Sequence, residues 1–450
     1  MPTYVLKTRI PTLATAQAVG TQPTIAIAVP EMVGRSCHLE GYQARDVPAF
    51  DLSEQIIAYA SPDSTFAVTK RLIDAAKESI LVGIYDFTAS YMEDLLLAAM
   101  ARKVKVSLML DIDSRTESDI FDRLVQMGAR GVSAPSCANP TVHVFSSSHE
   151  KVIVIDNEWV LVQSGNYSVN SIPMNVEDGA SGGVFRPGNR DTGLAIRSRE
   201  LSGFFAGILE ADMALVDAVP EMLRRPVEDE FFLVERAPAR KPEQLFTSET
   251  FDLDAPLTIQ PVLSPDNYMD VVPGLIAKAR KSVLIEQQYI RSSQPLVARL
   301  LAAIAEARNA APELDVRIVL GKLFSKSDVA KEKKNLENLA ANYGLNIAEN
   351  IRYINTDEFV HCHNKMVIVD GDSILISSQN WSDAAVSRNR EAGVWLTHPG
   401  IAAYFTKIFE NDWASAFQTL PEVDAPEVMT PEALGAGGYI RVDRGDYEEV

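Results

Sequence analysis

The feature that most constrains this 450-residue chain is that it repeats itself. The tripeptide Ser-Pro-Asp occupies residues 61–63 and returns at 264–266, and the segment 75–82 aligns with 278–285 at the same offset. Farther along, a segment that ends at Asp156 matches one that ends at Asp370, at a longer offset. Loops of different length therefore separate shared elements. A unit of about 200 residues is too long for a solenoid repeat, so we predict a duplicated domain.

Each unit presents its elements in the same order. Pro and Asp, both favourable in the first turn of a helix, precede an amphipathic helix, which an apolar strand, a second helix and a second strand follow. Strands that alternate with helices predict an α/β fold with a largely parallel or mixed sheet. The predicted elements are 64–77, 80–85, 92–101 and 104–110 in the first unit, and 266–281, 283–289, 296–307 and 314–320 in the second.

The segments outside the repeat divide the chain further. Residues 1–50 have no counterpart in the repeat, and the region between the units carries four prolines with mixed charges, as a linker does. The last thirty residues hold eight acidic side chains against two arginines. The predicted division is an N-terminal extension 1–50, a first half 51–218, a linker 219–255, a second half 256–418 and an acidic tail 419–450.

Charge and cysteine content narrow the compartment and the partners. A formal net charge of −19 argues against non-specific adhesion to nucleic acid or to an anionic membrane. No apolar run is long enough to span a bilayer, and the N-terminus has no signal-like apolar core, so we predict a cytoplasmic protein. A mature secreted protein that has lost its signal peptide would show the same sequence features. Cys37, Cys137 and Cys362 form no CxxC pair, which predicts neither a disulfide framework nor a cysteine zinc site, and favours a reducing compartment.

Four of the six histidines lie in two short windows, which share the pattern H-x-K-x4-D. Residues i and i+2 of a strand point the same way, so the histidine and lysine of each motif share one face. The aspartate has the opposite parity, which predicts a structural role. The two motifs consist of His149, Lys151 and Asp156 and of His363, Lys365 and Asp370.

Short polar residues follow each motif at identical distances, and an Asn-Arg-acid tripeptide follows these. Each half therefore offers an imidazole, a fixed cation and hydrogen-bond donors, which together form an anion site with a reactive group. Phosphoryl transfer needs these parts, because lysine and asparagine offset the charge on phosphate oxygens while one imidazole attacks and the other protonates the leaving oxygen. Two lysines take the place of metal charge, so we predict neither a metal nor another cofactor. The followers are Ser164, Asn166 and Asp191 in the first half and Ser378, Asn380 and Glu391 in the second.

On these motifs, roughly residues 60–416 of the chain resemble the phospholipase D superfamily, with both HKD motifs in one polypeptide. The resemblance implies two pseudo-symmetric α/β/α halves with one active site at their interface. It implies His149 as nucleophile, His363 as general acid, and a phosphate-binding set of Lys151, Lys365, Asn166, Asn380, Ser164 and Ser378. Asp191 and Glu391 would fix the histidine tautomers. The first half departs from the second by 14 extra residues between its Asn and its acid, an insertion that suits either a substrate lid or a surface loop.

The reaction class leaves the substrate open. Our first hypothesis is a metal-independent phosphodiesterase that acts through a phosphohistidine, with a phospholipid hydrolysed or transferred to an alcohol. The alternative is a nuclease that cleaves DNA or RNA, which the acidic composition makes less favourable. A non-catalytic binding module is the weakest hypothesis, because both H-x-K sets are intact. His361 shares the parity of His363 and suits either a structural role or the lining of a pocket. Oligomeric state is not predicted.

Overall fold

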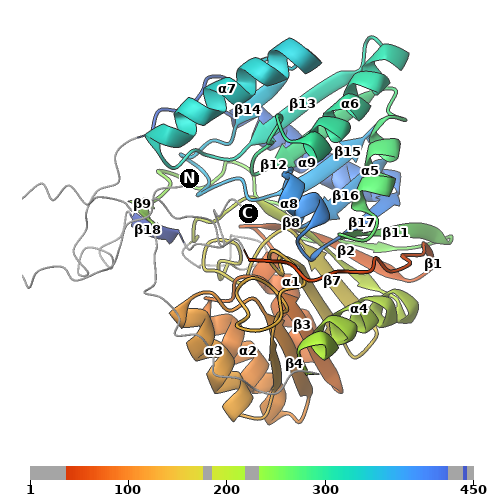
Figure 1. The fold of residues 1–450 in the computed structure, drawn as a ribbon, viewed down its shortest axis with the longest axis vertical. Helices are drawn as coiled ribbons and strands as arrows, with labels where there is room; N and C mark the ends of the chain where they lie inside the picture. Colours follow the sequence, from red (N-terminus) through yellow and green to blue (C-terminus); the bar gives the residue numbers. More distant parts are fainter. Residues whose placement is uncertain (1–36, 176–184, 218–232, 424–438, 443–450) are drawn as a thin grey trace, which may run out of the picture.

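The computed structural model describes residues 37–175, 185–217, 233–423 and 439–442, and these form two halves, each built on an eight-stranded sheet (Figure 1). The first sheet has the order β10-β2-β8-β7-β6-β3-β4-β5. Its strands are β2 (Gln55–Ser61), β3 (Ser79–Ile84), β4 (Lys105–Leu110), β5 (Arg130–Ser133), β6 (Lys151–Ile155), β7 (Trp159–Gln163), β8 (Asp191–Arg197) and β10 (Glu249–Asp252).

The second sheet repeats this topology in the order β1-β11-β17-β16-β15-β12-β13-β14. Three neighbouring strands in each sheet are parallel and the other pairs are antiparallel, which confirms the predicted mixed α/β sheet. The strands of this second sheet are β1 (Phe50–Leu52), β11 (Leu257–Ser264), β12 (Ser282–Gln287), β13 (Asp315–Leu320), β14 (Ile351–Tyr353), β15 (Lys365–Val369), β16 (Ser373–Ser377) and β17 (Glu391–Thr397).

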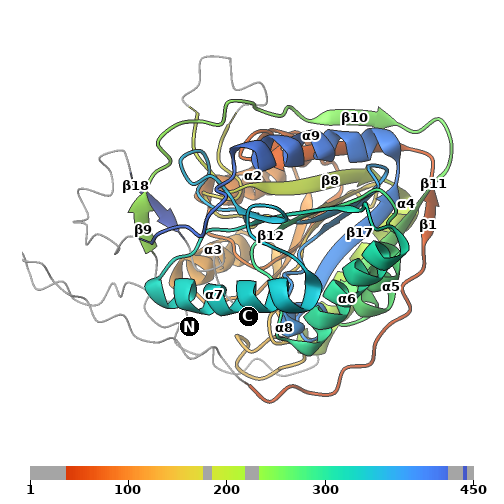
Figure 2. The same cartoon turned by 90° about the horizontal axis from the view of Figure 1, so that it is seen from above.

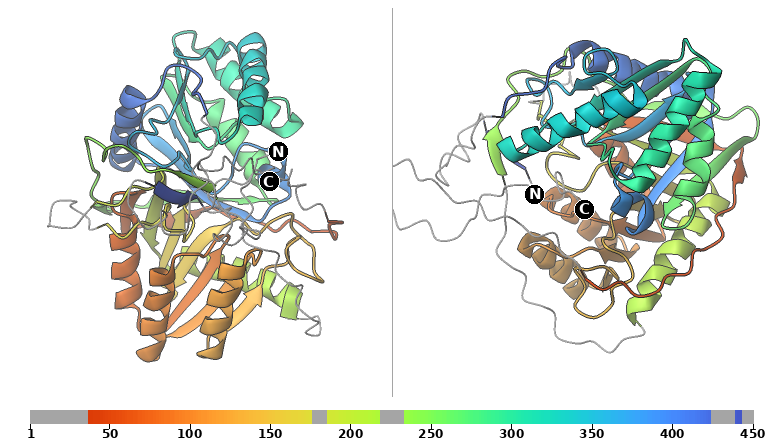
Figure 3. Two further views of the ribbon diagram at one scale, coloured as in Figure 1. Left: turned by 90° about the vertical axis from the view of Figure 1, so that its left-hand side faces the viewer. Right: turned by 45° about the horizontal axis from the view of Figure 1, so that its top comes forward.

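Helices cover both sheets (Figure 3). The three main clusters of buried apolar side chains lie between these helices and the sheets. Alternate strand residues point outward against α1–α3 in the first half and against α5–α7 in the second, while the opposite faces share one central core with α4 and α9. The duplicated α/β/α architecture is thereby confirmed. The helices are α1 (Thr65–Ala75), α2 (Ser90–Ala101), α3 (Arg115–Gln126), α4 (Arg199–Asp217), α5 (Tyr268–Ile276), α6 (Pro295–Ala310), α7 (Lys326–Tyr343), α8 (Asp383–Ser387) and α9 (Pro399–Ser415).

The two edge strands β1 and β10 exchange between the halves (Figure 2). β1 precedes the first half in sequence but pairs with β11 of the second sheet, and β10 lies in the predicted linker but pairs with β2 of the first sheet. Both strands contain Phe-Asp, followed by Leu, at 50–52 and 251–253. β1 and β10 therefore occupy equivalent edge positions in the two sheets, and Phe50 has a structural counterpart in Phe251. The division of the chain into domains stays a prediction. The tripeptide is too short to stand out as a repeat until the pairing is known.

The linker and the tail meet in a two-stranded ribbon. Strand β9 (Leu233–Arg236) from the linker pairs antiparallel with β18 (Tyr439–Val442) from the acidic tail. Most of the tail and residues 1–36 lie outside the described residues, as does 176–184, the larger part of the predicted insertion.

The prediction that the cysteines form no disulfide is wrong. Cys37 and Cys137 are bonded to each other, with their Cα atoms 5.6 Å apart, and Cys362 is free and buried. A separation of 100 residues leaves no local spacing for a sequence pattern to detect, because folding alone brings the two segments together. Within the described ranges, every helix is too short or too polar to traverse a bilayer.

Candidate active site

Both H-x-K motifs begin strands at the boundary between the halves. Lys151 is the first residue of β6 and Lys365 the first of β15, so each histidine lies two residues before a central strand. The backbone N–H of His149 donates to the carbonyl of Arg390 at 2.7 Å, and that of His363 donates to the carbonyl of Arg190 at 3.0 Å. Each histidine is therefore held by a backbone segment of the opposite half.

The predicted carboxylates cross the boundary in the same way. The Nδ1 of His149 lies 2.8 Å from Oε2 of Glu391, and the Nδ1 of His363 lies 3.0 Å from Oδ1 of Asp191. A carboxylate on Nδ1 fixes the tautomer and leaves Nε2 for chemistry. The sequence pattern identified both acids but not which histidine each one serves. The longer chain segment before Asp191 has not displaced it from this position.

The two predicted phosphate-binding serines contact these carboxylates. Ser164 Oγ donates to Asp191 Oδ1 at 2.8 Å, and Ser378 Oγ donates to Glu391 Oε2 at 2.5 Å. Each serine hydroxyl proton is directed at a carboxylate oxygen, so the geometry favours a role in positioning the acids.

The two lysines are as deeply buried as the histidines. Lys151 and Lys365 are at most 1% exposed, and the Nζ of each donates to the carbonyl of the histidine two residues earlier. Burial lowers the pKa of Lys151 to about 7, partly opposed by the charge of Glu391. Burial likewise raises the pKa of Glu391 to about 8. The pKa values of both groups thus lie near neutral pH.

Both imidazoles are kept neutral at neutral pH. Burial, followed by the charges of Lys151 and Lys365, lowers the pKa of His149 well below its usual range. Burial and Lys365 lower the pKa of His363 to about 4, although Asp191 acts in the opposite direction. Its Nε2 has no hydrogen-bond partner among the described residues. A neutral imidazole with a bare Nε2 lone pair is competent as a nucleophile or base.

The two predicted asparagines occupy equivalent buried positions after β7 and β16. Asn166 is 0% exposed and Asn380 is 2% exposed, and within the described ranges the Oδ1 of Asn380 accepts no hydrogen bond. Each asparagine follows the carboxylate-bound serine by two residues, and its side-chain amide is a group that can donate to a phosphate oxygen.

Asp156 and Asp370 directly follow the far ends of β6 and β15, about 17 Å from the lysines that begin these strands at 3.3 Å per strand residue. Each carboxylate accepts backbone N–H groups from three consecutive residues, 77–79 for Asp156 and 280–282 for Asp370. These contacts hold the turn between a helix and the neighbouring strand.

Two buried arginines were missed by the sequence reasoning. The guanidinium of Arg190 donates to Asp412 at 2.6 Å and to Asp63 at 2.6 Å, and that of Arg390 donates to Asp212 at 2.7 Å and to Asp266 at 2.5 Å. Each arginine thus binds one aspartate of its own half and one of the opposite half. All six residues belong to matched positions of the repeat, and charged residues repeated in both halves were the signal available.

Each arginine directly precedes the acid that orients a histidine. Its ion pairs therefore hold the backbone that carries this acid. Removing one partner of such a buried pair typically costs about 3–5 kcal/mol. No group of three or more His, Cys, Asp or Glu side chains within the described ranges could hold a metal ion.

The fold and this doubled His–Lys–carboxylate set define the class of protein, and a family comparison agrees. A family model described as a cardiolipin synthase, PLD-like domain matches residues 69–181 and 273–413, more than half of the chain. The chain belongs to this phospholipase D-like family, as the motifs predicted.

Individual relatives are more distant. The DISARM protein DrmC of Bacillus paralicheniformis is 36% identical over 122 residues, which are 26% of this chain and 48% of that protein, so the match spans about half of the relative's length. Phosphatidylserine synthase of Haemophilus influenzae has a TM-score of 0.58 at 16% identity over 84% of this chain and 91% of its own, which shows a common fold. Nuc from Salmonella typhimurium, a phospholipase D family member, has a TM-score of 0.30 at 22% identity, covering 36% of this chain and 96% of its own.

Proposed function

We propose that this protein is a phosphodiesterase that needs no metal and works through a phosphohistidine. The observation that carries the proposal is the crossed pair of contacts, His149 with Glu391 and His363 with Asp191, beside two buried lysines. One site with two oriented imidazoles supplies both the nucleophile and the acid that a phosphodiester requires.

The proposed reaction has two balanced steps. His149 Nε2 attacks phosphorus, a P–N bond forms, the P–O bond to the departing alcohol breaks, and His363 gives that oxygen its proton. A water or a second alcohol then loses a proton to His363 and attacks phosphorus, which breaks the P–N bond and regenerates His149. Lys151, Lys365, Asn166 and Asn380 bind the phosphate oxygens, while Ser164 and Ser378 position the carboxylates.

Substrate binding must supply the proton state that this reaction needs. His363 has a pKa of about 4, so at neutral pH it is deprotonated in the free protein. An anionic phosphodiester beside it favours the imidazolium, which raises its pKa as the complex forms. We therefore expect the basic limb of kcat to lie at higher pH than that of kcat/KM.

A phospholipid is the proposed substrate class. Leu323 and Phe324 line a cavity that includes His361, next to the site, and a net charge of −19 opposes the approach of a long polyanion. Nucleic acid is the second candidate, because Arg291, Lys322 and Lys331 line the same cavity and suit a phosphate backbone.

Turnover of bis(p-nitrophenyl) phosphate tests the reaction class. We expect wild-type activity to persist in excess chelator and His149→Ala to abolish it, with Lys105→Gln on the outer end of β4 as an exposed control. Activity lost in chelator would contradict the metal-free mechanism. A panel of choline and ethanolamine phospholipids against single- and double-stranded DNA and RNA then separates the two substrate classes.

The cytoplasmic location stays a prediction. The Cys37–Cys137 bridge weighs against it, because structural disulfides persist mainly in oxidising compartments.

A further inference from the structure

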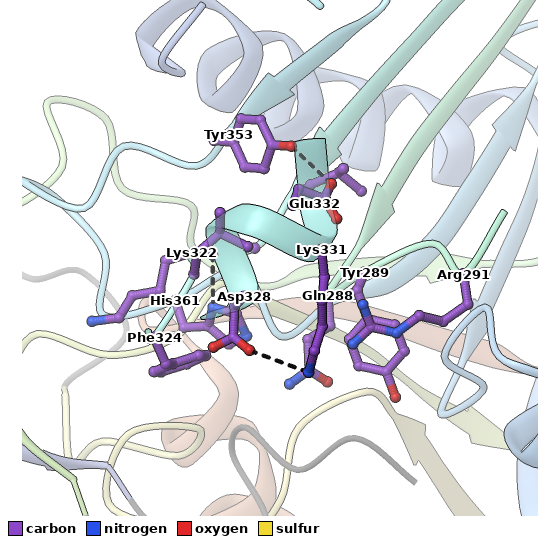
Figure 4. A pocket seen from close by; sticks show the side chains of 13 residues that line it. Gln288, Tyr289, Arg291, Lys322, Phe324, Asp328, Lys331, Glu332, Tyr353 and His361 are labelled. Atoms are coloured by element: carbon purple, nitrogen blue, oxygen red, sulfur yellow. Dashed lines mark hydrogen bonds and ion pairs between the residues drawn. The ribbon is translucent and has the colours of Figure 1, made fainter. Parts of the chain in front are cut away.

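A cavity opens at the carboxyl ends of the parallel strands β12, β13 and β14, beside the second H-x-K motif (Figure 4). Its walls come from the loops after β12 and β13, from the start of α7, and from His361, whose ring centroid lies 6.4 Å from that of His363. The carboxyl edge of parallel strands is where open α/β sheets bind ligands. The cavity is therefore within reach of a group carried on one arm of a substrate whose phosphorus is at His363.

The tautomer of His361 is determined by its neighbour. The backbone N–H of Lys322 donates to Nδ1 of His361 at 3.0 Å, so in the neutral ring the proton is on Nε2 (Figure 4). Burial, together with nearby positive charge, lowers the pKa of His361 well below its usual range and keeps it neutral. The His361 side chain is 0% exposed, and no described residue accepts a hydrogen bond from its Nε2.

A buried N–H without an acceptor costs about 1–3 kcal/mol, so a residue with this geometry points to a ligand that accepts. The charged side chains around it favour an anion. Arg291, Lys322 and Lys331 line the cavity with the two acids Asp328 and Glu332. Asp328 pairs with Lys331 at 3.9 Å and accepts from Ser325, and Glu332 accepts from Tyr353, so Arg291 and Lys322 are the cations whose charge favours an anion.

The first half lacks this arrangement. Ser147 occupies the position equivalent to His361, and Asp111 the position equivalent to Gly321. Ser147 Oγ donates to Asp111 at 2.9 Å, which fills the corresponding space with an acid–hydroxyl pair. In the second half a Cβ on residue 321 would lie 2.2 Å from Cε1 of His361, so only glycine leaves room for the ring. Glycine in place of Asp111 and histidine in place of Ser147 thus put an imidazole N–H donor in the second half alone.

We propose that the His361 cavity binds a second phosphate of the substrate, carried on the ester arm next to His363. This rests on the proposed function and narrows its substrate to a phosphodiester with a phosphorylated alcohol arm. His361 Nε2–H donates to the second phosphate, and Lys322 and Arg291 offset its charge. With His363 as general acid, this arm is the alcohol that leaves.

Two synthetic phosphodiesters test the subsite. They share one fluorescent ester arm and differ only in the other, which is glycerol or glycerol 3-phosphate, and chromatography of the products identifies the bond that is cleaved. We expect wild type to favour the glycerol 3-phosphate arm by about tenfold or more in kcat/KM, since a charge-assisted hydrogen bond contributes about 1.5–3 kcal/mol. We expect His361→Phe to lose most of this preference, and His361→Asn, which keeps an N–H donor, to retain more of it.

The ratio of the two substrates within one variant cancels differences in folding and in the chemical step. Lys326→Gln, an exposed lysine at the start of α7, is the matched control and should keep the wild-type ratio. Equal kcat/KM for both substrates in wild type, or an unchanged ratio in His361→Phe, overturns the subsite and leaves the proposed function intact. Cleavage of neither substrate overturns the proposed function. In that case calorimetric binding of glycerol 3-phosphate decides the subsite, which falls if wild type and His361→Phe bind it equally.

Discussion

The two buried arginines occupy equivalent cages, yet the cages are completed from different parts of the chain. The guanidinium of Arg390 lies 4.4 Å from the ring of Phe145, and that of Arg190 lies 4.5 Å from the ring of Phe359. A further aromatic ring closes each cage, Tyr42 at 5.2 Å from Arg390 and Phe246 at 5.8 Å from Arg190.

Only Tyr42 also makes polar contacts. Its hydroxyl donates to Asp266 at 2.7 Å and accepts from Arg390 at 2.7 Å, and the neighbouring Arg45 donates to Asp212 at 2.7 Å. The segment that carries Tyr42 is tethered by Cys37 to the first half. The support behind Glu391, and hence behind His149, therefore depends on a disulfide-anchored segment, whereas the support behind Asp191 comes from the region just before β10. The Arg–Asp ion pairs are therefore the same in both halves, whereas the aromatic residues that cover them come from different segments.

The largest effect on activity should appear when the crossed carboxylates are neutralised one at a time, and the two variants should differ in their pH dependence. We expect Asp191→Asn and Glu391→Gln each to lower kcat by about 10²–10⁴, since a catalytic histidine that loses its orienting acid can lose about 10⁴ in kcat. The charge of Asp191 raises the pKa of His363, so its removal should lower that pKa further below about 4. The basic limb of kcat/KM, where His363 loses its proton, should then move to lower pH.

The pH–rate profiles of both variants check this, with Glu410→Gln on the exposed face of α9 as a control that keeps the wild-type profile. A basic limb that moves to higher pH in Asp191→Asn would contradict the assignment of His363 as the acid.

Removing either arginine should destabilise the fold by similar amounts. Arg190→Met leaves Asp63 and Asp412 without their cation, and Arg390→Met leaves Asp266 without its cation and Asp212 with Arg45 alone. We expect each substitution to cost about 3–5 kcal/mol in the free energy of unfolding. Urea unfolding measures this, and Arg197→Met, which removes half-exposed ion pairs with Glu54 and Glu158, should change stability by about 0.5 kcal/mol or less. A loss confined to one arginine would show that the cages are not equivalent.

Only the Arg390 cage includes a segment that a disulfide anchors. We expect the double variant Cys37→Ser/Cys137→Ser to unfold about 2–4 kcal/mol more easily than oxidised wild type. Reductant should lower wild-type stability towards that of the double variant and leave the double variant unchanged, as urea unfolding with and without reductant would measure. Wild-type stability that does not respond to reductant would mean that the N-terminal segment docks without its tether.

The smallest expected effect belongs to the hydroxyl of Tyr42. Tyr42→Phe converts the Arg390 cage to the aromatic composition of the Arg190 cage, and we expect a loss of about 1–3 kcal/mol because Arg390 and Asp266 each lose a hydrogen bond. Tyr343→Phe on α7 serves as the control and should be nearly neutral. If Tyr42→Phe is neutral as well, the ring alone supports Arg390.

The sequence predicted many of the site residues because the duplicated halves carry them at matched positions. The H-x-K motifs, the serines and asparagines after them and the two acids all stand at matched positions, and the structure brings the histidines and acids into contact. The sequence could not predict that each acid contacts the histidine of the other half. Alignment of a repeat compares each half with the other, whereas contact between the halves depends on how they dock.

Contacts between distant segments also explain the other features that the sequence did not predict. The Cys37–Cys137 bond, the exchange of β1 and β10, and the space that Gly321 leaves for His361 each join segments far apart in the chain. By itself the sequence determined two α/β units, their strand and helix order, and the set of phosphate-handling side chains, because periodicity and spacing are local properties. Only the tertiary structure decided which half orients which histidine, since burial and non-local hydrogen bonds arise when the units pack against each other.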